Sequence, residues 1–221
     1  MEIQQRLTAF LQTIPKSVQL VAVSKTKPDE LILEAYKSGQ RIFGENKVQD
    51  LAAKCPRLPN DIQWHFIGHL QRNKVKFVAP FVSMLHGIDS LKLLIEVNKQ
   101  AVKNDRIIPC LLQFHIAEEA TKFGLNMQEA EDLLGDERFQ QLKNIRISGI
   151  MGMATYTSDE NQIRREFRNL KQYFQLLKDR HFSDDLSFKE ISMGMSGDYR
   201  IAIEEGSTMV RIGTKIFGSR N

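Results

Sequence analysis

Short apolar runs alternate with longer amphipathic stretches along almost the whole chain. Apolar runs bounded by turn residues predict buried strands over residues 18–24, 41–44, 62–67, 82–87, 107–115, 145–151, 188–192 and 208–212. The intervening segments have apolar residues at helical spacing and predict helices over residues 28–38, 45–54, 70–78, 90–104, 126–134, 160–180 and 198–204. A further amphipathic segment, from Ile3 to Ile14, predicts an extra N-terminal helix that Pro15 ends.

Eight strands separated by helices favour a parallel sheet closed into a TIM-like (β/α)8 barrel, because such barrels close at eight strands. The nearly continuous apolar strands agree, because parallel strands are covered on both faces. Strand counting leaves an open doubly wound sheet as the alternative. No low-complexity stretch or linker rich in proline and glycine interrupts the 221 residues. We therefore expect one α/β domain over residues 1–221.

The composition narrows the class of protein and its partners. Hydrophobic residues make up 42% and charged residues 26% of the chain, as in ordinary soluble domains. Cys55 and Cys110 lack metal-ligand spacing and indicate reduced thiols. The N-terminus is not a signal peptide, and no apolar run approaches the ~18 residues of a membrane span. With a net charge of only +4 and both signs mixed, we expect a cytoplasmic protein that binds neither membrane nor nucleic acid.

A lysine follows the first predicted strand, at the end where barrels carry their reactive groups. Most lone lysines are solvated surface charges. Lys25, however, follows an apolar strand and precedes a helix that starts near Pro28. A lysine partly withdrawn from water has a lowered pKa, so its neutral amine can form a Schiff base. Asn46, after the second strand, either hydrogen-bonds a ligand oxygen or, with Glu45, caps the next helix.

The histidines near strand ends raise the question of a metal. His65 and His69 are four residues apart, which is compatible with zinc ligands. Gly68 lies between them where strand gives way to helix, so we do not expect one common face. His86 and His115 also fall near strand ends, but no carboxylate accompanies any of these histidines there. We therefore expect no metal site.

The ends of the seventh and eighth strands are rich in glycine and hydroxyl groups. Barrels frequently bind phosphate with the loops after these two strands, through backbone N–H groups and hydroxyls. The candidates are Ser192, Gly194, Ser196 and Gly197 after the seventh strand, and Gly213 and Thr214 after the eighth. The alternative is that each glycine only makes a turn. Arg211 points to the same side of its strand as Gly213, and a buried arginine needs a partner such as a phosphate or a ring nitrogen.

A Schiff-base lysine, a phosphate site and an inward arginine together indicate an aldehyde that carries a phosphate. Pyridoxal 5'-phosphate and a phosphosugar both satisfy this description.

Six segments resemble the signature blocks of the pyridoxal phosphate homeostasis protein family. In chain order they are VAVSKTKP, FGENKVQ, WHFIGHLQRNK, GIMGMA, SMGMSGDY and VRIGTKIFG, and they extend from Val21 to Gly218. The resemblance implies the fold of the alanine racemase N-terminal domain, a fold-type III barrel, with pyridoxal 5'-phosphate held by Lys25 as an internal aldimine. It also implies that Arg211 faces the pyridine nitrogen and that Asn46 lies near the ring substituents. The implied phosphate ligands are Ser192, the backbone around Met195 and Ser196, and Gly213 with Thr214.

The same resemblance implies a monomer with a role in the homeostasis of pyridoxal phosphate and of amino and keto acids, without established catalysis. Apo-enzymes that receive the cofactor are the protein partners it suggests. Because the chain ends at Asn221, we expect none of the C-terminal β-domain of alanine racemase, and we identify no clear second base. Two alternatives stay open: an amino-acid racemase or decarboxylase with Tyr156 or His65 as base, and a class I aldolase that uses Lys25 on a phosphosugar.

Overall fold

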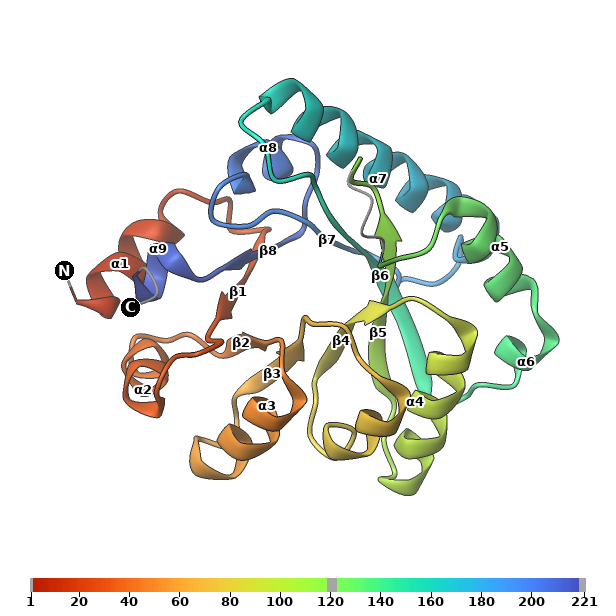
Figure 1. The fold of residues 1–221 in the computed structure, drawn as a ribbon, viewed down its shortest axis with the longest axis horizontal. Coiled ribbons are helices and arrows are strands. Elements are labelled where there is room, and N and C mark those ends of the chain that lie inside the picture. Colours follow the sequence, from red (N-terminus) through yellow and green to blue (C-terminus); the bar gives the residue numbers. More distant parts are fainter. Residues whose placement is uncertain (1, 119–122, 219–221) are drawn as a thin grey trace.

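The strands form a closed parallel barrel in the order β1-β2-β3-β4-β5-β6-β7-β8 (Figure 1). The computed structural model describes residues 2–118 and 123–218. The strands are β1 (Gln19–Val23), β2 (Ile42–Glu45), β3 (Gln63–Phe66), β4 (Met84–Ile88), β5 (Ile108–His115), β6 (Ile145–Met153), β7 (Glu190–Ser192) and β8 (Met209–Ile212). Closure comes from β1 and β8, which pair in parallel with Val21 opposite Arg211. The (β/α)8 prediction is therefore confirmed, and the open doubly wound sheet is wrong.

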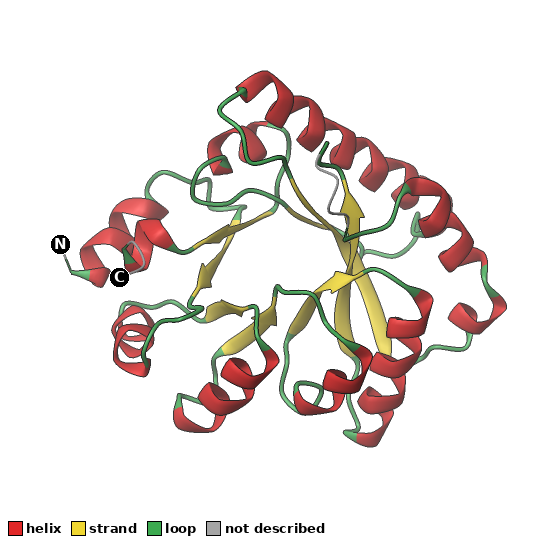
Figure 2. Ribbon diagram, viewed as in Figure 1, coloured by secondary structure: helices red, strands yellow, loops and turns green. Residues whose placement is uncertain are grey.

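Helices surround the barrel on its outside (Figure 2). They are α1 (Ile3–Leu11), α2 (Asp29–Lys37), α3 (Val48–Lys54), α4 (Leu91–Lys103), α5 (Met127–Gly135), α6 (Glu137–Gln140), α7 (Glu160–His181), α8 (Tyr199–Glu204) and α9 (Thr214–Phe217), with 3-10 helices η1 (Cys55–Arg57) and η2 (Arg72–Phe77). Of the helices in residues 2–118 and 123–218, none is long and apolar enough to cross a membrane.

Four details of the predicted elements were wrong. The helix predicted over residues 45–54 begins at Val48, because Glu45 still belongs to β2. The segment predicted as a helix over residues 70–78 is the 3-10 helix η2. The N-terminal helix ends at Leu11, before the stop expected at Pro15. The short helices α6 and α9 were not predicted, because four residues are too few to show a helical period.

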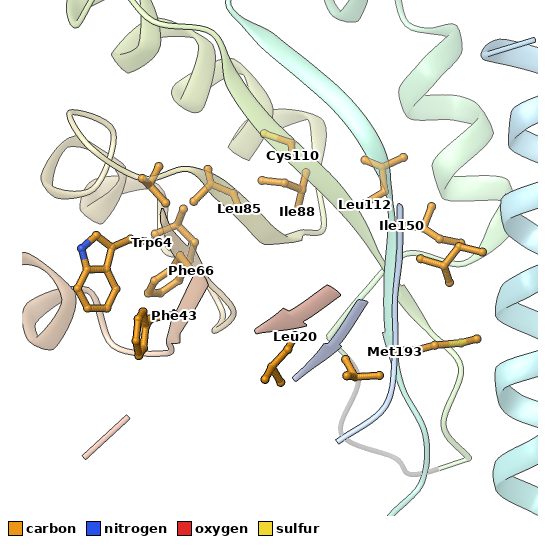
Figure 3. Packing of buried hydrophobic residues seen from close by; sticks show 14 of the residues in the cluster. Leu20, Phe43, Trp64, Phe66, Leu85, Ile88, Cys110, Leu112, Ile150 and Met193 are labelled. Carbon is orange, nitrogen blue, oxygen red and sulfur yellow. The ribbon is translucent and has the colours of Figure 1, made fainter. Parts of the chain in front are cut away.

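The two faces of the strands have different surroundings. Phe43, Trp64 and Phe66 belong to the main hydrophobic cluster (Figure 3), and the rings of Phe43 and Trp64 are 5.9 Å apart. The opposite face points into the barrel. A Cβ added at Gly44 would lie 2.8 Å from Cγ1 of Val21, so the valine side chain occupies the interior beside this glycine. Alternation along each strand therefore directs every second side chain into the barrel.

Candidate functional site

Lys25 lies at the carboxyl end of β1, where the chain turns away from the barrel. The N–H of Ser24 still donates to Gly44 O of β2, at 3.0 Å, so the parallel pairing continues as far as Ser24. The chain then reverses, with Thr26 at φ 64° and the N–H of Lys27 donating to Ser24 O. Lys25 is partly buried in this turn. This is the strand-end position that the sequence predicts for a reactive amine.

A buried ion pair supports this turn from outside the barrel. Lys54 of α3 lies 2.7 Å from Glu45 Oε1 and also donates to Ser24 O at 3.0 Å. The Ser24 hydroxyl donates to the same Glu45 oxygen at 2.7 Å. The cluster of Ser24, Glu45 and Lys54 thus fixes the residues that directly precede Lys25 and Asn46.

The capping role considered for Glu45 and Asn46 is wrong. The N-cap of α3 is Lys47, and it makes no side-chain cap hydrogen bond. Lys54 was missed by the sequence analysis, because a lysine in the last turn of an amphipathic helix is usually a surface residue. No local signal distinguishes it, since its partners Ser24 and Glu45 are 30 and 9 residues away.

The turns after β7 and β8 lie side by side. Ser196 Oγ accepts a hydrogen bond of 3.4 Å from the N–H of Gly213, and Gly194 O accepts one of 2.9 Å from the N–H of Arg211. Gly194 has φ 95°, a conformation that side chains other than glycine rarely adopt. The two turns that the sequence analysis proposes for phosphate binding are therefore adjacent at the barrel mouth.

The N–H of Met195 already has a partner in this turn. It donates to the carboxylate of Asp198, the residue before α8. Burial raises the pKa of this carboxyl group, while the hydrogen bond from Met195 and the charge of Arg211 oppose the rise. The Met195 side chain itself is exposed at the rim of the mouth. Ser196, Gly213 and Thr214 also contribute hydroxyls and backbone N–H groups to these turns, and groups of this kind can bind an anion.

Four buried polar side chains form a hydrogen-bonded chain across the barrel interior, which we call the interior chain. His65 Nδ1 of β3 lies 3.0 Å from His86 Nε2 of β4, and His86 Nδ1 lies 3.1 Å from Ser192 Oγ of β7. Arg211 of β8 donates to Ser192 Oγ at 2.6 Å. Since β4 and β8 face each other across an eight-stranded ring, the interior chain spans the barrel from one wall to the other.

Burial controls the charges in the interior chain. It lowers the pKa of His65 to about 3. It also lowers the pKa of His86 well below the usual value, and the neighbouring His65 and Arg211 add to this effect. Burial lowers the pKa of Arg211 to about 10, while the charge of Asp198 acts in the opposite direction. At neutral pH the two imidazoles are therefore neutral and the guanidinium is the cation.

The structure does not bring His65 and His69 together. His69 is exposed, with Nδ1 at 3.4 Å from Asp89 Oδ2 and its ring 4.6 Å from that of Phe123. Within residues 2–118 and 123–218, no group of three or more histidine, cysteine or carboxylate side chains could hold a metal ion.

Comparisons of the sequence with protein families and with curated proteins point to the same family. The sequence matches the family described as "Alanine racemase, N-terminal domain" over residues 2–221. It is 35% identical to the "Pyridoxal phosphate homeostasis protein" of Aquifex aeolicus, over 98% of this chain and 97% of the relative. The protein of the same name from Vibrio alginolyticus is 42% identical, over 94% of this chain and 88% of the relative.

Solved structures show the same fold. PipY of Synechococcus elongatus, without pyridoxal phosphate, has a TM-score of 0.91 and 33% identity, covering 98% of this chain and 100% of PipY. The structure of PipY with pyridoxal phosphate bound has a TM-score of 0.87 over the same shares of both chains. An alanine racemase from Clostridium difficile, with a TM-score of 0.75 and 12% identity, covers 99% of this chain and 56% of its own, and shows the shared fold alone.

Proposed function

The chain belongs to the pyridoxal phosphate homeostasis protein family, within the wider family of the alanine racemase N-terminal domain, and on this basis we propose that it binds pyridoxal 5'-phosphate through Lys25. Its role is the homeostasis of this cofactor and of amino and keto acids. The observation that carries the proposal is the contact between Ser196 Oγ and the N–H of Gly213. This contact joins two anion-binding turns at the end of the barrel where Lys25 also lies.

The residues of the mouth fit each part of the cofactor. Lys25 would hold the aldehyde carbon of the cofactor through its side-chain nitrogen. Ser196, Gly213 and Thr214 supply hydroxyls and N–H groups to the phosphate. Arg211 would donate to the pyridine nitrogen, and Asn46 would lie near the ring substituents. When bound, the cofactor supplies an electrophilic carbon and an electron-accepting ring.

The charge of Arg211 favours storage over fast chemistry. With a pKa of about 10, the guanidinium keeps its protons at neutral pH. An arginine that donates to the pyridine nitrogen leaves this nitrogen unprotonated, which weakens the ring as an electron sink. A carrier that binds and releases the cofactor does not need a strong electron sink.

The residues considered as a second base do not support a racemase or decarboxylase. Tyr156 is 99% exposed, outside any enclosed site. His65 is buried, is hydrogen-bonded to His86 and has a pKa of about 3, too low for a base at neutral pH. We further propose a cytoplasmic, monomeric protein with one domain over residues 1–221, which passes its cofactor to apo-enzymes.

The experiment that tests cofactor binding is reduction with borohydride followed by mass spectrometry. Protein incubated with pyridoxal 5'-phosphate should show a visible absorption band, and reduction should leave the pyridoxyl phosphate mass on the peptide that contains Lys25. Lys25→Ala should lose both signals. Lys27→Ala is the matched control, because Lys27 donates instead to the carbonyl groups of Phe217 and Gly218. A colourless wild type that takes up no added cofactor would contradict the proposal.

A further inference from the structure

The position of the Arg211 guanidinium depends mainly on Ser192. Its Nη1 donates to both O and Oγ of Ser192, at 2.8 and 2.6 Å, and its Nη2 donates to Gly152 O at 3.0 Å. A guanidinium has five N–H donors. Among the described residues, these three bonds leave one N–H on Nε and one on Nη2 for a ligand. Ser192 and Gly152 therefore determine where the remaining donors point.

The hydroxyl of Ser192 has a second partner, His86. The Ser192 hydroxyl already accepts a hydrogen bond from the cationic Arg211, and this makes its own O–H a stronger donor. His86 Nδ1 lies 3.1 Å away and can accept that proton, while Nε2 on the other side of the ring donates to Nδ1 of His65. In this head-to-tail arrangement each hydrogen bond polarises the next. The reverse arrangement would make Ser192 Oγ accept twice and would lose this cooperativity.

Burial keeps the interior chain dry. Ser192 and His86 have no exposed surface, and His65 and Arg211 are each 4% exposed. Removal of one member would leave a buried polar group without its partner, which costs more than the net strength of the bond itself. The interior chain therefore has one favoured arrangement, with the guanidinium at one end.

We infer that Ser192 and His86 are positioning residues that hold Arg211 against the pyridine ring, and that the hydroxyl of Ser192 donates to His86 and not to the phosphate. This inference rests on the proposed function and deepens it. It differs from the family resemblance, which places Ser192 among the phosphate ligands. Ser192 would then affect any ligand with the pyridine ring, with or without a phosphate.

Binding of two aldehydes shows whether Ser192 acts on the pyridine ring, through Arg211, or on the phosphate. Pyridoxal 5'-phosphate and 5'-deoxypyridoxal share the ring and the aldehyde, but the second lacks the phosphate. We expect Ser192→Ala to weaken binding of both aldehydes by the same factor, about tenfold, because a hydrogen bond to a charged group is lost. Ser196→Ala should weaken binding of pyridoxal 5'-phosphate far more than binding of 5'-deoxypyridoxal. Titration of the absorption band of the Lys25 adduct gives each dissociation constant.

Two variants of His86 test whether its imidazole, through Ser192, holds Arg211 in place. His86→Leu removes both hydrogen bonds and should reproduce the effect of Ser192→Ala on both aldehydes. It should also shift the pH at which the adduct band changes, because the guanidinium beside the ring nitrogen moves. His86→Asn keeps a polar atom near the position of Nδ1 and should restore most of the affinity. Thermal unfolding shows whether each His86 variant folds. If neither folds, the binding of both aldehydes by Ser192→Ala tests the positioning role.

The outcomes separate this inference from the proposed function. If Ser192→Ala weakens only pyridoxal 5'-phosphate, Ser192 is a phosphate ligand and the inference is overturned. The same holds if folded His86→Leu binds both aldehydes as the wild type does. If the wild type forms no adduct with either aldehyde, the proposed function itself fails.

Discussion

The ammonium group of Lys54 lies 2.7 Å from Oε1 of Glu45, and both side chains are buried beneath the turn that carries Lys25. The other carboxylate oxygen, Glu45 Oε2, is buried without a hydrogen-bond partner among the described residues. Because the pair connects α3 to the ends of β1 and β2, it links the stability of the barrel to the geometry of its mouth.

Breaking this ion pair should strongly destabilise the protein. Lys54→Met leaves the carboxylate of Glu45 without its counter-charge, and removal of one partner of a buried pair typically costs about 3–5 kcal/mol. The double variant Lys54→Met with Glu45→Leu should lose less, since neither charge is then buried alone. Urea unfolding of the wild type, both single variants and the double variant measures the free energies. Equal losses in the single and double variants would contradict this account.

The buried histidines should make the protein less stable in mild acid. His65 has a folded pKa of about 3, below the usual 6.5, so the unfolded chain binds its proton first as the pH falls. Stability is therefore complete above about pH 6.5 and decreases between pH 6.5 and 3. At pH 5 this histidine should cost about 2 kcal/mol. Urea unfolding at pH 7 and 5 measures the change.

Two histidine variants provide the comparison for this pH effect. His65→Gln has no titrating ring and should reduce the loss of stability between pH 7 and pH 5. His69→Gln makes the same substitution at an exposed histidine of the same sequence segment, outside the interior chain, and serves as the matched control. If the two variants lose the same free energy in acid, the buried imidazole is not the cause.

The two cysteines should differ in reactivity. Cys110 on β5 is fully buried, and burial raises its pKa far above the usual range. Cys55 is only partly buried, and burial raises its pKa less. Because the thiolate is the reactive form, a disulfide reagent at pH 8 should modify Cys55 slowly and leave Cys110 intact until denaturant is added. Two fast reactions in the folded protein would be inconsistent with this arrangement.

The pattern of apolar and polar residues predicted the barrel, because whether a residue is buried in a strand or helix shows in the spacing of apolar residues close to it in the sequence. Each strand is a short apolar run, and Lys25, Arg211 and Gly213 fall at the ends of such runs. Hydrogen bonds between distant side chains have no local pattern. His86 is 21 residues from His65 and 106 from Ser192, so their partnership emerges only when the barrel closes.

A pair of neighbouring glycines gives the sharpest test of the turn after β7. Gly194 has φ 95°, and an added Cβ would lie 2.6 Å from Cβ of Ala202. A Cβ at Gly197 would have no atom of the described residues within 4 Å. Gly194→Ala should therefore lose about 1–3 kcal/mol of stability through strain and should weaken cofactor binding, because Gly194 O accepts from the N–H of Arg211. Gly197→Ala should stay within about 0.5 kcal/mol of the wild type. Urea unfolding and titration of the adduct band measure the two effects. If both variants unfold at the urea concentration of the wild type, the backbone at Gly194 does not constrain the mouth.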